Sequence, residues 1–99
     1  GMKSFDINKR YLEIIRNEVI EPACNELRHE LKLPSATTVP LSEREIEMFW
    51  GLHGRIFYLA IRRFVYDTPT PGRPDDIVLD AVRGFLDGAR AVMPEIVPS

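Results

Sequence analysis

His53 is the side chain in this sequence with the clearest capacity for chemistry, because it stands in the middle of an apolar stretch of chain. Phe49 and Phe57 lie one helical turn to either side of it, and Trp50 lies beside Phe49. An imidazole among apolar neighbours needs a hydrogen-bond partner, and it can bind a ligand or transfer a proton near neutral pH. The pattern is typical of either a pocket around His53 or a core histidine bonded to a backbone carbonyl, and we favour the core histidine.

A strip of cationic and aromatic side chains runs along the same stretch of chain. At about 100° per residue its members share one polar face of a helix, with Arg63 adjacent to it: Arg44, Arg55, Tyr58, Arg62 and Tyr66. Arginine and tyrosine together can bind phosphate groups and stack on bases, so the strip is a candidate site for nucleic acid or an acidic partner. The formal net charge of −2 gives no general attraction to nucleic acid, which we do not expect as a partner. We expect a solvated strip, or one that meets acidic residues of the last helix: Asp76, Asp80 and Asp87.

Metal ligands and a reactive thiol are the next possibilities. Glu26 and His29 have the Glu-x-x-His spacing that helical bundles use for paired metal ions. On a helix, however, His29 points away from the apolar side that contains Leu27, so we expect a surface histidine and no metal site. Cys24 lies on that apolar side without a cysteine partner, as a small hydrophobic residue would. The sequence also lacks a glycine-rich phosphate loop and a nucleophile elbow, and therefore favours a non-enzymatic role without a cofactor.

Three helical segments must hold these residues, separated by two proline-rich connections, residues 34–40 and 67–73. The first segment is expected from about Asp6 to Leu33. Its apolar residues change face after Pro22, which has no amide hydrogen and whose ring crowds the preceding turn. We therefore predict a kink or a break at Pro22.

The second segment has the best-defined start in the chain. Ser42 and Glu45 stand at capping-box spacing, and the helix should extend from there to about Tyr66. The third segment should begin at Pro74, because proline suits the first position of a helix. The prolines from Pro94 onward are expected to close it.

Composition places the chain among single-domain globular proteins, with 44% apolar and 28% charged residues. Gly1 precedes Met2, the pattern that a cleaved expression tag leaves, so we expect the domain to span residues 2–99. No signal-peptide core follows Met2 and Cys24 is the single cysteine, which together favour a cytoplasmic protein. The expected fold is all-α, with three main helices, the first kinked at Pro22, in an antiparallel bundle.

The second segment carries more apolar surface than two neighbouring helices of the same chain can cover. Apolar side chains occupy well over half of its circumference between residues 44 and 66, and such a helix is normally buried on nearly all sides. Charged residues such as Arg55 and Arg62 interrupt every window long enough to cross a membrane, so no membrane span is expected. We therefore expect a homodimer, the commonest closed assembly.

Two surfaces are candidates for the dimer contact. One is the second helix, and the other is a small-residue surface of the third helix: Ala81, Gly84, Gly88 and Ala91. The sequence favours a non-catalytic domain for self-association or for binding another protein. A small-molecule binder or enzyme with a pocket at His53, and a nucleic-acid binder that uses the arginine strip, are the alternatives. No motif is specific enough to indicate a known family.

Overall fold

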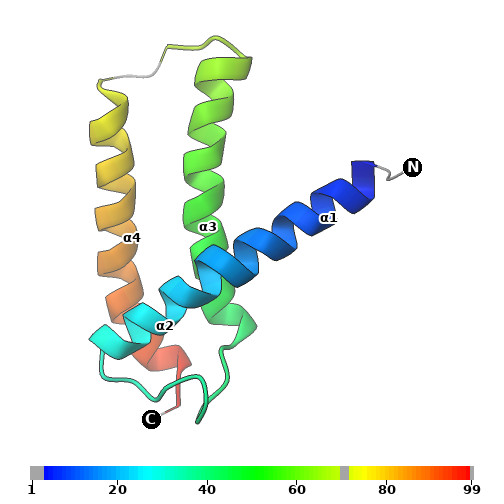
Figure 1. Ribbon diagram of the computed structural model, residues 1–99. Helices are drawn as coiled ribbons and strands as arrows, with labels where there is room; N and C mark the ends of the chain where they lie inside the picture. The colour runs from blue at the N-terminus through cyan, green and yellow to red at the C-terminus, as the bar shows by residue number, and fades with distance from the viewer. Residues whose placement is uncertain (1–3, 70–71, 99) are drawn as a thin grey trace.

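The computed structural model describes residues 4–69 and 72–98, which are helical apart from their connections (Figure 1). In chain order the elements are α1 (Ser4–Ile15), η1 (Arg16–Ile20), α2 (Glu21–Glu30), α3 (Glu43–Ala60), η2 (Ile61–Val65) and α4 (Pro74–Ile96). The two η elements are single π-helical turns within longer helices. The predicted all-α class is confirmed, with three helical segments that contact one another and no strand in the described ranges.

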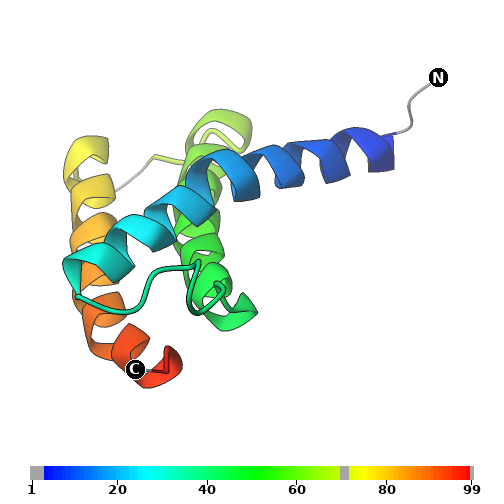
Figure 2. The same ribbon diagram turned by 60° about the horizontal axis from the view of Figure 1, so that its bottom comes forward.

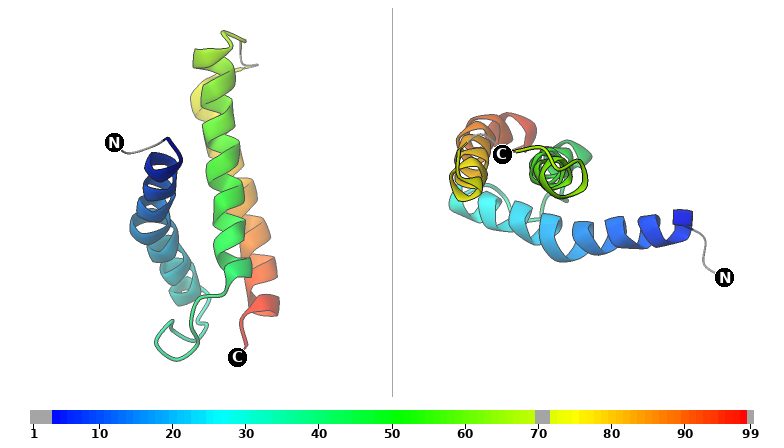
Figure 3. Two further views of the ribbon diagram at one scale, coloured as in Figure 1. Left: turned by 90° about the vertical axis from the view of Figure 1, so that its right-hand side faces the viewer. Right: turned by 90° about the horizontal axis from the view of Figure 1, so that it is seen from above.

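The first segment runs through α1, η1 and α2 without a sharp bend at Pro22 (Figures 1 and 3). Its irregularity lies one turn earlier, in η1, where the backbone N–H of Glu21 donates to the carbonyl of Arg16, five residues back. Pro22 has no N–H to donate, and the wider π turn before it accommodates the missing backbone hydrogen bond. The predicted kink is therefore replaced by a π turn, and the helix ends at Glu30 rather than at Leu33.

The α3–η2 and α4 helices run antiparallel and side by side, whereas the α1–α2 segment crosses them obliquely (Figures 1 and 2). The predicted antiparallel bundle is therefore correct only for this helical hairpin. The capping box predicted at Ser42 and Glu45 is present, and α4 begins at Pro74 as expected. Pro94 does not end α4, which continues to Ile96, because a proline in the last turn removes only one hydrogen bond of the helix.

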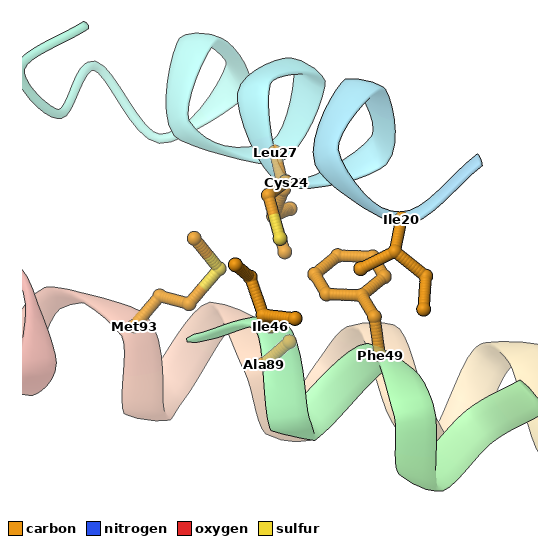
Figure 4. Packing of buried hydrophobic residues seen from close by; sticks show 7 residues of the cluster. All are labelled: Ile20, Cys24, Leu27, Ile46, Phe49, Ala89 and Met93. Carbon is orange, nitrogen blue, oxygen red and sulfur yellow. The ribbon is translucent and has the colours of Figure 1, made fainter. Parts of the chain in front are cut away.

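The core lies where α2 crosses the hairpin (Figure 4). Each of the three segments contributes to it: Ile20, Cys24 and Leu27 from η1 and α2, Ile46 and Phe49 from α3, and Ala89 and Met93 from α4. The ring of Phe49 packs edge-on against Phe85, with centroids 4.7 Å apart. Burial raises the pKa of the Cys24 thiol to about 12, so this residue acts as the small hydrophobic side chain that the sequence indicates.

A buried ion pair joins α2 to the start of α3. The Arg28 guanidinium donates to both carboxylate oxygens of Glu45, at 2.8 and 2.7 Å, and both side chains are at most 2% exposed. The Ser42 backbone N–H and hydroxyl donate to the same carboxylate, each at 3.0 Å. The remaining Arg28 donors bind backbone carbonyls of the connection between the helices, namely those of Pro34, Val39 and Pro40. All five N–H groups of the guanidinium are therefore engaged.

Replacing Arg28 tests how much of the fold depends on this pair. Arg28→Met leaves the Glu45 carboxylate buried without its cation and three carbonyls without a donor. We expect the free energy of unfolding, measured by urea denaturation at fixed protein concentration, to fall by about 3–5 kcal/mol. Arg90→Met is the matched control, because Arg90 pairs with Glu30 at the surface, and its loss should cost at most about 1 kcal/mol. Equal losses for the two variants would contradict this assignment.

The same pair sets the acid sensitivity of the fold. Burial alone raises the pKa of the Glu45 carboxyl, but the hydrogen bonds from Arg28 and Ser42 outweigh it and hold the pKa below its ordinary value. A carboxyl with a lowered pKa stabilises the folded state above its unfolded-state pKa, and this stability is lost as the pH falls through the folded-state value. Between about pH 5 and pH 3 the wild-type free energy of unfolding should therefore decrease more steeply than that of Glu45→Gln. Parallel curves for the two proteins would show that Glu45 is not responsible.

Candidate interaction surface

Large apolar side chains are exposed mainly on two helical segments. Among the described residues they are Ile7, Tyr11, Leu12, Ile14 and Val19 on α1–η1, Phe57, Tyr58, Phe64, Val65 and Tyr66 at the end of the α3–η2 helix, and Leu79 and Val92 on α4. The most exposed is Phe64, at 78%. A contiguous apolar patch on a water-soluble surface is typical of an interface. The excess apolar surface predicted for the second helix is present, toward its C-terminal end.

Helix α1 extends beyond the α3–α4 hairpin and has little of the chain to pack against (Figures 1 and 3). Its apolar residues Ile7, Tyr11 and Ile14 recur at helical spacing, and each is more than two-fifths exposed. Among the apolar side chains of α1 that the structure describes, only Ile15 packs partly against the core cluster. At the following turn, Arg16 donates to both carboxylate oxygens of Glu43 at 2.6 and 3.1 Å, which fastens η1 to the start of α3.

The aromatic corner, formed by Tyr11, Trp50, His53 and Phe57, lies where α1 meets α3. The Tyr11 hydroxyl is 3.5 Å from His53 Nε2, a long hydrogen bond. The His53 ring stacks on Phe57 with centroids 6.0 Å apart, and Trp50 meets it edge-on at 5.6 Å. His53 is half-buried rather than fully buried, and its hydrogen bond is to a tyrosine instead of the backbone carbonyl we expected. The reason is that α1 diverges from α3 at this point and leaves the imidazole at the edge of the fold.

Phe49 does not belong to this corner. The structure brings together three of the four residues of the predicted pocket, His53, Trp50 and Phe57, but the Phe49 ring turns into the core and packs on Phe85. Tyr11 occupies the place beside His53, and sequence periodicity could not have indicated it because it comes from another helix. The corner is an open surface feature in this chain, with Phe57 51% exposed.

The arginine strip is exposed along its whole length, including Arg44, Tyr58 and Tyr66. The Arg62 guanidinium lies 5.3 Å from the ring centroid of Tyr58, and that of Arg63 lies 5.7 Å from Phe64. These contacts cover aromatic faces with cations and are typical of solvent-exposed helices that carry aromatic residues.

In the ranges that the structure describes, Arg55 and Arg62 form no ion pair with Asp76 or Asp80. The hollow that these arginines line between α3 and α4 measures only about 80 Å³. Asp87 instead approaches Arg90 of its own helix, at 3.4 Å.

Two hollows of the described surface lie around α2. One of about 570 Å³ is lined by Leu27, Glu30 and Leu86 among others, and another of about 440 Å³ is lined by His29 and the following connection. Both are wide open to solvent, and the donors of Arg28, which lines the second hollow, are already engaged. His29 is exposed, as its position on the helix indicated, and no group of three metal-ligating side chains occurs within residues 4–69 and 72–98.

The buried Arg28–Glu45 pair is the feature that the sequence analysis missed. A signal was present, because Arg28 follows Cys24 by four residues and therefore falls on the apolar side of the first segment. A charged residue in such a position indicates a buried partner.

None of the described helices combines the length and the hydrophobicity that a membrane span needs. Comparison with known proteins adds no relative, since no family model, curated protein or solved structure matches the chain.

Removing the Tyr11 side chain tests how α1 is held. A helix as short as α1 is marginal in water on its own, so Tyr11→Ala should raise amide hydrogen exchange in residues 4–15 by about tenfold and leave α4 unchanged. Glu13→Ala is the control, because Glu13 is exposed on the polar side of the same helix. Unchanged exchange in α1 of the Tyr11 variant would show that the aromatic corner does not hold this helix.

Proposed function

We propose that this chain is a non-catalytic helical protein whose role is self-association, and that it forms a homodimer through the exposed apolar residues of α1 and of the end of the α3–η2 helix. The observation that carries the proposal is the amount of surface that the single chain leaves uncovered. A compact monomer of this mass exposes about 5,800 Å², whereas this chain exposes 7,287 Å².

The exposed surface of this chain exceeds that of a compact monomer by about 1,500 Å², which can be compared with the area that a stable interface buries. Each partner in a standard protein–protein interface buries about 800 Å², so one chain has more than enough excess surface for a stable contact. The shape of the chain is consistent with this excess of exposed surface. Its radius of gyration is 15.8 Å, whereas a compact chain of this length has a radius of gyration of about 13 Å. The molecule is flat, measuring 46 × 42 × 16 Å, so apolar side chains find few neighbours across its short dimension.

The kind of surface also supports an interface between proteins. Among the described residues, ten of the twelve large exposed apolar side chains lie on α1–η1 and on the end of the α3–η2 helix, and five of those ten are aromatic: Tyr11, Phe57, Tyr58, Phe64 and Tyr66. Aromatic residues and arginine are enriched where protein partners meet. For a pocket at His53 or a nucleic-acid site on the arginine strip, no feature of the described surface offers comparable support.

Mass in solution tests the proposal directly. Size-exclusion chromatography with light scattering, over a range of concentrations, should give about twice the chain mass of 11.4 kDa. Ile14→Asp and Phe64→Asp each place a charge in the proposed contact and should raise the dimer dissociation constant by about tenfold or more.

Leu79→Asp is the matched control, because Leu79 is 53% exposed on α4, outside the proposed contact. It should leave the dissociation constant unchanged. A wild-type protein that stays monomeric at every concentration would overturn the proposal.

A further inference from the structure

The position of the exposed residues relative to the aromatic corner indicates how two copies would fit together. From that corner, α1 and α3 diverge, as Figure 1 shows. Ile7, Tyr11 and Ile14 form the α1 row, with spacings of four and three residues. Trp50, His53, Phe57 and Phe64 form the α3 row, with spacings of three, four and seven. These are the spacings by which helices pack side by side along an apolar seam.

We infer that the partner is a second copy of this chain and that the two copies interlock: α1 of each lies along the exposed α3 row of the other. The inference rests on the proposed self-association and adds the geometry of the contact. In a two-fold arrangement both contacts form at once, because each copy offers one α1 row and one α3 row. Both rows of both chains are then covered, and the open aromatic corner is closed by the partner.

The amount of surface favours a second copy as the occupant. The excess of about 1,500 Å² per chain is nearly twice what each partner contributes to a single standard contact of about 800 Å². Two reciprocal contacts, one through each row, account for an excess of that size. The rows also differ in kind, since the α1 row offers the aliphatic Ile7 and Ile14 and the α3 row offers the aromatic Phe57 and Phe64.

Charges beside the two rows are complementary as well. The chain has no acidic residue from Met48 to Tyr66, and Arg55 and Arg62 are exposed there without an ion pair in the described residues. Glu18 lies one turn beyond Ile14, exposed and likewise without an ion pair in the part of the chain described. When α1 of one copy lies along α3 of the other with Ile7 near Phe64, this carboxylate comes close to Arg55.

Cross-linking between two different single-site variants tests the arrangement. Ile7→Cys and Phe64→Cys are prepared separately, one of them labelled with nitrogen-15, and mixed before a short bismaleimide is added. Any link between positions 7 and 64 in the mixture must join two chains. Native Cys24 can stay, because it is fully buried and burial raises the pKa of its thiol to about 12. Both new cysteines replace exposed side chains, so circular dichroism should show an unchanged fold.

We expect the link between positions 7 and 64 to exceed a link between Ile7→Cys and Val92→Cys by about tenfold or more, because proximity in the complex raises the effective concentration. Val92 is the control on α4, where it is 37% exposed. A dimer that links only through position 92 would overturn the interlocked arrangement and leave self-association standing. A monomer without any cross-links would overturn both.

Discussion

The arrangement of the whole chain depends on the buried contact between Arg28 and Glu45. A buried ion pair is often no better than an apolar pair of the same size, since both charges must be removed from water. This pair differs because Arg28 also satisfies three carbonyls of the connection that an apolar residue would leave without partners. The contact therefore fixes the connection, the start of α3 and the direction of α2 together. With α2 held across the hairpin, Cys24 and Leu27 face Ile46 and Met93 in the core.

That crossing has a geometric consequence for α1. The helical segment from Ser4 to Glu30 is on the order of 40 Å long, whereas two helices side by side are about 20 Å wide. A helix that continues through its π turn without a sharp bend must therefore extend beyond the hairpin it crosses. The exposure of Ile7 and Leu12 follows from this mismatch, as does the position of His53 at the edge of the fold. A true kink at Pro22 would have allowed α1 to fold back onto α3.

The sequence predicts features that act within one turn of chain, but it predicts little of how the helices pack against one another. Ser42 and Glu45, and the proline at position 74, act within one turn of chain, so their roles could be predicted from spacing. Helical periodicity likewise identified excess apolar surface on the second helix. It could not identify Tyr11 as the neighbour of His53, because periodicity gives the face of a helix and not the helix that it meets. For the same reason the partner of Arg28 could not be predicted, because Glu45 lies on another helix.

In the proposed dimer, the exposed helix α1 also links folding to dimer formation. A short helix with few tertiary contacts spends part of its time unfolded, and a partner that binds only the helical form shifts that equilibrium. In the proposed dimer, some of the binding free energy must then order α1, so its affinity should be lower than the buried area alone suggests. The anchors at Tyr11 and Arg16 reduce this cost, because they hold α1 close to its bound direction before the partner arrives. In the proposed dimer, the aromatic corner and the Arg16–Glu43 pair would therefore favour association by preorganising α1.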